Sequence, residues 1–94
     1  MTARPDFAAV PKLAPHRKLK FDAARKCWVI QAPERAFVLD EIAQAVVSRC
    51  DGTRTLAVVV DELCALAVDA PRDVIENDVA ELVQGLVAKG VMVL

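Results

Sequence analysis

The sequence is poor in the residues on which most enzyme active sites are built. It contains one histidine, His16, only three glycines and no tyrosine, and its three cysteines show no C-x-x-C spacing. A single histidine offers at most one general base, and three scattered glycines do not make a nucleotide-binding loop. The cysteines fit neither a disulfide framework nor a zinc site, which favours a reducing cytosol. We therefore expect no enzyme activity, no metal and no cofactor.

An enzymatic role rests on one thiol only. Cys50 and Cys64 fall on apolar helical stripes, where cysteine acts as a small hydrophobic residue. Cys27 stands beside Lys26 and is the only cysteine near the electropositive setting that a reactive thiol needs. Loss of function on alkylation of Cys27 is the observation that would support an enzyme.

Long apolar runs are also missing. No window reaches eighteen uninterrupted apolar residues, and the N-terminus has no apolar core of the signal-peptide type. The 94 residues, 55% hydrophobic and 27% charged, suit one globular domain with a single core. These features predict a cytoplasmic protein with no membrane partner.

Charge is unevenly distributed although the net charge is only −1. Residues 1–35 carry eight Lys and Arg against three Asp and Glu, whereas residues 36–94 carry four against ten. The protein is either an electrostatic dipole whose basic face attracts an acidic ligand, or a fold in which the two signs complement each other. The sequence leaves both arrangements open.

The first part of the chain predicts an arm and then strands. Residues 1–15 contain three prolines, which disfavour helix, and form an extended N-terminal arm; residues 16–94 form the folded domain. The arm either packs on its own domain, reaches over a neighbouring subunit or stays flexible. Alternating β-forming residues predict a hairpin of strands at 17–21 and 27–31 and a short third strand at 36–39.

Amphipathic helices account for the rest of the chain. Apolar residues at spacings of three and four predict helices over about 39–50, 55–68 and 71–89. Lys89-Gly90 ends the last of them, with Gly90 available for a left-handed cap. Strands followed by helices predict an α+β fold, a small winged-helix-like domain with a three-stranded antiparallel sheet followed by three helices.

The first two predicted helices are separated by a string that we call the central motif, Asp51-Gly52-Thr53-Arg54-Thr55. Asp-Gly favours a backbone reversal because glycine accepts a positive φ and aspartate bonds its own local backbone. Thr55 precedes an apolar run and can cap the second helix with its hydroxyl. The motif therefore predicts the end of one helix and the start of another.

A winged-helix shape suggests DNA binding, but the charges oppose it. The third helix would be the recognition helix, yet it carries four acidic residues against Arg72 and Lys89. A nucleic-acid-binding regulator remains the alternative hypothesis. The favoured hypothesis is a peptide-binding groove, in which an extended peptide adds as a fourth strand to the free edge of the third strand beside a helix. A second arrangement, with that edge blocked by the arm or by another subunit, stays open.

Four segments together resemble the PqqD family over about residues 13–94. They are the hairpin with Arg35-Ala36-Phe37-Val38-Leu39, the central motif, the helix with Asp78-Val79-Ala80-Glu81-Leu82, and the Lys89-Gly90-Val91 ending. The central motif is the most specific of them. The resemblance implies a non-catalytic peptide chaperone of pyrroloquinoline quinone (PQQ) biosynthesis, of the kind called a RiPP recognition element. Such proteins bind the precursor peptide PqqA and present it to the radical SAM enzyme PqqE.

In that family the peptide adds to the third strand, in the groove beside the third helix. Carried over to this chain, the resemblance implies peptide-binding residues on the strand and on the helix: Ala36, Phe37, Val38, Leu39, Val79, Leu82, Val83 and Leu86. The chain departs from the family where a Glu often completes a capping box after the motif, because Leu56 to Val59 stand there instead. The larger apolar surface of the second helix then suits docking of PqqE or a homodimer. A homodimer through the N-terminal arm is also open.

Overall fold

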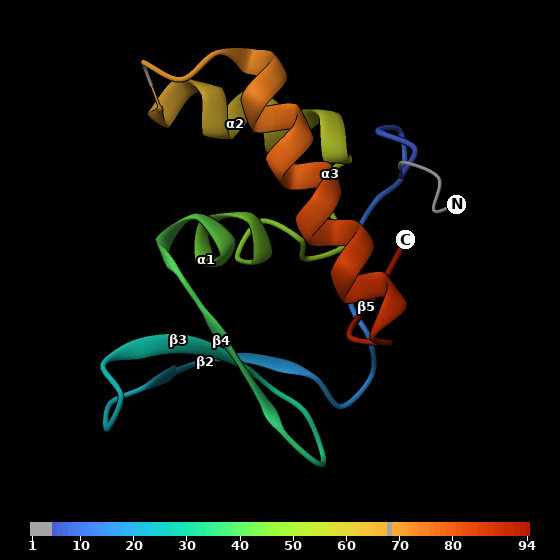
Figure 1. The fold of residues 1–94 in the computed structure, drawn as a ribbon. Helices are drawn as coiled ribbons and strands as arrows, with labels where there is room; N and C mark the ends of the chain where they lie inside the picture. The colour runs from blue at the N-terminus through green and yellow to red at the C-terminus, as the bar shows by residue number, and fades with distance from the viewer. Residues whose placement is uncertain (1–4, 68) are drawn as a thin grey trace.

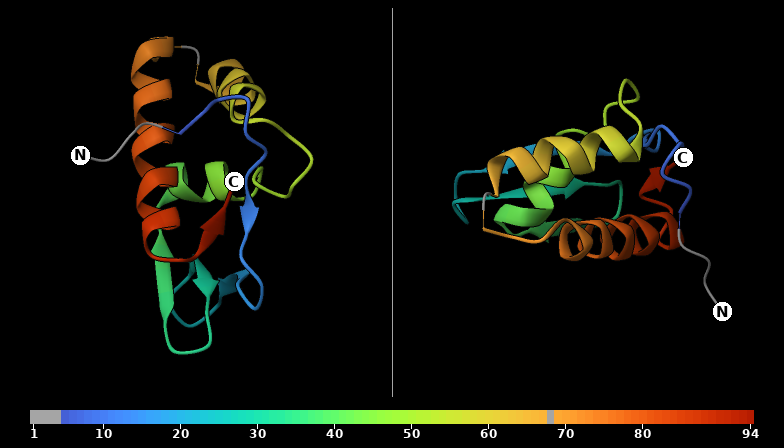
Figure 2. Two further views of the ribbon diagram at one scale, coloured as in Figure 1. Left: turned by 90° about the vertical axis from the view of Figure 1, so that its right-hand side faces the viewer. Right: turned by 90° about the horizontal axis from the view of Figure 1, so that it is seen from above.

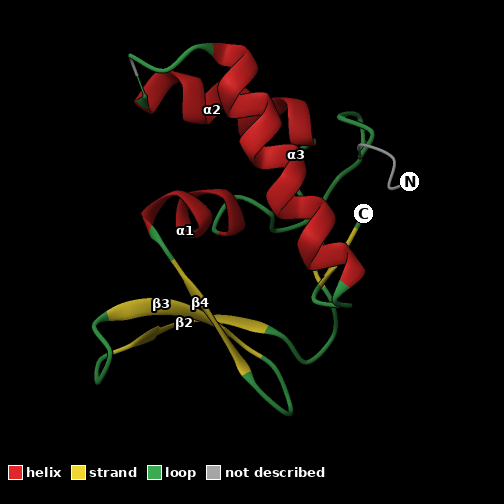
Figure 3. Cartoon of the chain, in the orientation of Figure 1, coloured by secondary structure: helices red, strands yellow, loops and turns green. Residues whose placement is uncertain are grey.

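The computed structural model describes residues 5–67 and 69–94, and its strands and helices form separate layers (Figures 1 and 3). The strands are β1 (Lys12–Leu13), β2 (Lys18–Asp22), β3 (Cys27–Gln31), β4 (Ala36–Leu39) and β5 (Met92–Val93). The helices are α1 (Glu41–Val47), α2 (Leu56–Leu66) and α3 (Arg72–Ala88). The predicted α+β fold, with a three-stranded antiparallel sheet followed by three helices, is confirmed. Val68, at the end of the predicted second helix, lies outside the described residues.

The three-stranded sheet has the order β2-β3-β4. Phe21 of β2 lies opposite Trp28 of β3, and their rings meet edge to face with centroids 5.5 Å apart. On the other side of β3, Ile30 lies opposite Phe37 of β4. Because β3 is central, β2 and β4 each keep one edge without a strand partner in the described part of the chain.

The described part of the N-terminal arm, residues 5–15, packs against its own chain. β1 pairs antiparallel with β5, and the sequence did not predict the strand at residues 12–13 (Figure 2). Three arm carbonyls also accept backbone hydrogen bonds from α2 and the central motif: Phe7 from Ala57, Ala9 from Leu56, and Pro11 from Gly52. The arm therefore covers the start of α2 and leaves the β4 edge open. The domain boundary at residue 15 stays a prediction.

The helix ends follow local chemistry. Asp40 caps α1 by accepting a hydrogen bond from the Ala43 amide at 2.7 Å, so α1 is shorter than the predicted 39–50 and begins only after β4 has ended. Thr55 caps α2 as predicted, since its hydroxyl accepts from the Val58 amide at 3.2 Å. Gly90, with φ of 73°, provides the left-handed turn after α3.

The hydrophobic core lies where the helices cover the inner face of the sheet. Ile30 of β3, Leu56 of α2 and Val83 of α3 are completely buried in it. Figure 1 shows the three helices on one side of the sheet, with α1 between the sheet and α2, and with α3 running from the level of α2 past α1 towards the sheet. No helix in the described ranges has the length and apolar character needed to cross a membrane.

Candidate functional site

The free edge of β4 presents the backbone groups of two residues. Ala32 donates a backbone hydrogen bond to Arg35 at 2.9 Å, which makes these two residues a hydrogen-bonded pair at the start of the β3–β4 ladder. Bonded pairs alternate along an antiparallel ladder, so Phe37 and Leu39 also direct their N–H and C=O groups at β3. The N–H and C=O groups of Ala36 and Val38 then point away from the sheet. They are available to an added strand.

The side chains of β4 alternate between the two faces of the sheet, in step with those backbone groups. Phe37 and Leu39 pack towards the core, with Leu39 buried and Phe37 half-buried. Ala36 and Val38 face outwards, and Val38 is 58% exposed. The structure thus separates the four predicted strand residues into two that anchor β4 and two that carry its free edge.

Helix α3 runs alongside β4 in the opposite direction. The Lys89 ammonium lies 5.7 Å from the centre of the Phe37 ring, while Leu82 shares a hollow with Asp40 at the other end of the strand. Seven helical residues span about 10 Å, and the three steps from Phe37 to Asp40 also span about 10 Å. The groove between β4 and α3 is therefore defined at its two ends, by Phe37 with Lys89 and by Asp40 with Leu82.

Of the four predicted groove residues on α3, only Leu82 is half-exposed. Val79, Val83 and Leu86 are 1%, 0% and 5% exposed and belong to the hydrophobic core. Their spacing of three and four residues marks one helical face, but it does not say whether that face meets the core or a groove. The structure places these three residues beneath the groove, and Leu82 at its surface.

The groove has ends of opposite charge. A hollow of about 350 Å³ beside Phe37 holds the cations Arg17, Arg35 and Lys89 and one carboxylate, Glu34. A hollow of about 400 Å³ beside Leu82 holds Asp40, Asp78 and Glu81, and no basic residue is among the described residues that line it. The sequence reasoning missed these seven charged residues as a set. Its only signal was the segregation of charge along the chain, which does not show that Lys89 lies beside residues 17 and 35.

The basic end is organised around Phe37. The guanidinium carbon of Arg35 lies 5.4 Å from the centroid of the Phe37 ring, so Arg35 and Lys89 both contact this ring. Cations over an aromatic ring are attracted by its negative face, and this contact holds them near the strand. An acidic side chain at this end of the groove would meet preplaced positive charge.

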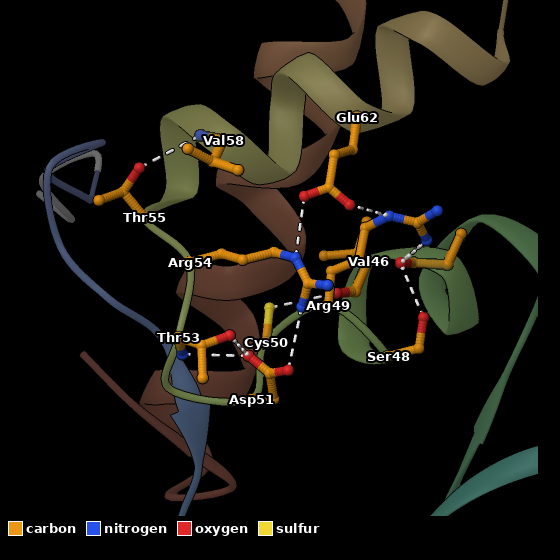
Figure 4. Close-up of polar contacts among 11 residues, drawn as sticks. Val46, Ser48, Arg49, Cys50, Asp51, Thr53, Arg54, Thr55, Val58 and Glu62 are labelled. Carbon is orange, nitrogen blue, oxygen red and sulfur yellow. Dashed lines mark hydrogen bonds and ion pairs between the residues drawn. The ribbon is translucent and has the colours of Figure 1, made fainter.

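The central motif lies away from the groove and joins α1 to α2 (Figure 4). Asp51 accepts hydrogen bonds from the amide and hydroxyl of Thr53, which lower the pKa of the Asp51 carboxyl, and the nearby Arg54 acts in the same direction. Arg54 binds Asp51 at 3.0 Å and Glu62 of α2 at 2.8 Å. Gly52 takes a φ of 83°. These contacts are internal to the loop and α2, which agrees with a structural role.

The same region matches a known family. The sequence pattern of the family described as Coenzyme PQQ synthesis protein D (PqqD) matches residues 27–92, which include β3, β4, the central motif and all three helices. This chain belongs to the PqqD family. Membership confirms the resemblance seen in the sequence.

Relatives and solved structures of the PqqD family agree with this assignment. A "PqqA binding protein" of Bradyrhizobium diazoefficiens is 46% identical over 83 residues, covering 88% of this chain and 80% of the relative. The solution structure of the PqqD truncation of Methylobacterium extorquens PqqCD, described as a functional and stand-alone RiPP recognition element, is 35% identical. It matches 99% of this chain and 97% of its own with a TM-score of 0.81. PqqD from Xanthomonas campestris is 41% identical, matching 90% of this chain and 93% of its own with a TM-score of 0.54.

In this member of the PqqD family the cysteines are free and dispersed. Cys27 and Cys64 are half-buried, whereas Cys50 is buried and donates its thiol to the Val46 carbonyl at 3.2 Å. Burial, together with the nearby Asp51 carboxylate, raises the pKa of the Cys50 thiol to about 12. Among the described residues no cluster of three or more His, Cys, Asp and Glu side chains suits a metal ion.

Cys50 is expected to resist alkylation in the folded protein. At pH 8 iodoacetamide should modify Cys27 and Cys64 first and reach Cys50 only after unfolding, because the thiolate is the nucleophile. Peptide mapping by mass spectrometry measures this order.

The raised folded pKa also predicts that the free energy of unfolding contributed by Cys50 is fully present below about pH 9 and is lost between about pH 9 and 12.

The matched variant is Cys50→Ala, which should be less stable at pH 8 but should lose less stability than the parent protein between pH 8 and pH 10. Chemical denaturation at the two pH values gives the comparison. Equal alkylation rates for Cys50 and Cys27 in the folded protein would contradict the burial of this thiol.

Proposed function

We propose that this protein is a non-catalytic chaperone of PQQ biosynthesis that binds the precursor peptide PqqA as an added strand on β4. The observation that carries the proposal is the β4 edge, which has no strand partner among the described residues and presents the backbone groups of Ala36 and Val38. Its relatives are named PqqA binding proteins, which supports PqqA as the peptide. In this role the protein presents PqqA to the radical SAM enzyme PqqE in the cytoplasm.

The β4 edge suits strand addition better than the other free edge of the sheet. β2 carries Lys18 and Lys20, both exposed, and edge lysines commonly discourage pairing with another chain. β4 has no charged residue within Ala36–Leu39 and lies beside a helix that can contact the peptide side chains. A peptide therefore gains both main-chain bonds and side-chain contacts only at β4.

The charged ends of the groove select the chemistry of the peptide. An acidic residue placed near Phe37 would meet Arg35 and Lys89, and a basic residue placed beyond Leu39 would meet Asp40 and Asp78. Complementary charges accelerate encounter and fix the register more than they raise affinity. The backbone bonds at Ala36 and Val38 supply affinity that depends little on sequence.

Charge on α3 disfavours the nucleic-acid alternative. Arg72 is paired with Asp61 at 2.7 Å and with Glu76 at 3.0 Å, and these carboxylates raise the pKa of its guanidinium. Lys89 lies over the Phe37 ring. Phosphate contacts need an excess of positive charge, whereas residues 72–89 carry four acidic side chains against two basic ones, and one of the two, Arg72, is already paired.

Titration of the ¹⁵N-labelled protein with PqqA tests the proposed site. Amide shifts should cluster at Ala36, Val38 and the Asp78–Leu82 turn of α3, while amides of the β2 edge should change little. The reason is that a new strand bonds directly to the first two amides and packs against that turn. Shifts confined to β2, or salt-dependent binding of DNA without binding of PqqA, would contradict the proposal.

A further inference from the structure

An apolar hollow lies between α1, α2 and α3, outside the site described above. Its volume is about 260 Å³, and its exposed walls include Ile42, Leu66 and Val74, which are 63%, 66% and 47% exposed. Glu41 and Asp78 are the only charged residues among the described residues that line it. Large aliphatic side chains gathered around a hollow mark a surface that binds an apolar group.

The hollow adjoins the acidic end of the peptide groove. Ile42 and Asp78 line both the apolar hollow and the hollow that contains Asp40 and Leu82 at the end of β4. A peptide paired with β4 that continues past Leu39 therefore crosses Ile42 and enters the space between the helices. This path is the same whichever direction the peptide chain takes along β4.

We propose that the apolar hollow binds the segment of PqqA that continues beyond the added strand, through aliphatic side chains flanked by Lys or Arg. This inference rests on the proposed function. The apolar walls require the aliphatic groups, and the acidic rim selects the flanking cations. Glu41 and Asp78 are both exposed and take part in none of the ion pairs between described residues, so their charge is available to a ligand.

The size of the hollow also favours a peptide segment over a second copy of the chain. It has room for a few aliphatic side chains and is smaller than a typical site for a drug-sized molecule, about 300 to 1,000 Å³. A stable contact between folded subunits buries on the order of 1,200 Å² or more. A segment joined to a strand already bound on β4 needs far less buried area, because its contact with the hollow is an intramolecular step and the cost of association has already been met.

The double variant Ile42→Gln with Leu66→Gln tests the inference. Both side chains are mostly exposed, so the substitutions should change stability little. The matched control is Val58→Gln, a residue of α2 that is 41% exposed and lies outside the lining of the hollow. Titration calorimetry with PqqA should show affinity about tenfold weaker for the double variant and within about twofold of the parent for the control.

Nuclear Overhauser contacts between PqqA and the methyl groups of Ile42, Leu66 and Val74 give a second readout. Unchanged affinity without such contacts, while PqqA still shifts the Ala36 and Val38 amides, would overturn this inference and leave the proposed function standing. Absence of PqqA binding to the parent protein would overturn both. If the double variant alters only self-association in sedimentation velocity, the hollow is a contact between copies and the inference is wrong.

Discussion

Replacing Val38 with proline is expected to weaken PqqA binding by about tenfold to hundredfold while the fold stays intact. The Val38 amide points away from β3, so proline removes a donor that the sheet itself does not use. Burying a peptide carbonyl without this donor lowers the binding free energy by about 1–3 kcal/mol. A loss of that size corresponds to the tenfold to hundredfold weaker binding. Titration calorimetry with PqqA measures the change.

The control for this substitution is Val38→Thr, which keeps the amide and a β-branched side chain. It should bind PqqA within about threefold of the parent, because the backbone donor is unchanged and Val38 is 58% exposed. Thermal unfolding followed by circular dichroism should show both variants folded. Tight binding by Val38→Pro would mean that the peptide does not add to this edge.

Replacing Leu86 with alanine is expected to destabilise the protein by about 2–5 kcal/mol. Leu86 is 5% exposed and packs in the core beneath the groove, so the substitution leaves a cavity there. Small domains are stable by only about 5–15 kcal/mol, and the loss should appear as a clearly lower midpoint in urea denaturation. Affinity for PqqA, measured where the variant is fully folded, should stay within about threefold of the parent.

Leu82→Asp is the contrasting substitution on the same helix. Leu82 is half-exposed at the acidic end of the groove, so the added carboxylate should weaken PqqA binding at a smaller cost in stability. If Leu86→Ala lowered affinity as strongly as Leu82→Asp under folding conditions, Leu86 would contact the peptide directly. The pair therefore separates a core residue from a groove residue.

Local sequence patterns predicted the elements because their causes are local. The alternation in residues 17–21 and 27–31 and the three-and-four spacing in the helices reflect backbone periods that a short segment carries by itself. The reversal at Gly52, the cap at Thr55 and the left-handed turn at Gly90 depend on residue types next to the backbone they serve. Family membership also followed from such strings, with the central motif as the most specific.

The groove needed contacts between residues far apart in the chain. Periodicity identified Val79, Val83 and Leu86 as one apolar face of α3, and only packing showed that this face is the core and that Leu82 lies at the edge of it. Local sequence patterns also could not predict that the arm packs on the domain, because β1 pairs with β5, which lies some eighty residues further along the chain. Long-range pairing of this kind depends on which surfaces remain after the core has formed.

The sequence by itself determined the order and type of the elements, the scarcity of catalytic groups and membership of the PqqD family. Only the tertiary structure decided which strand edge is open, which charges gather at each end of the groove, and that an apolar hollow adjoins it. Arg17, Arg35 and Lys89 illustrate the reason, since they come together only when the end of α3 reaches β4. Periodicity follows from the geometry of one segment, whereas a binding surface follows from the way several segments pack together.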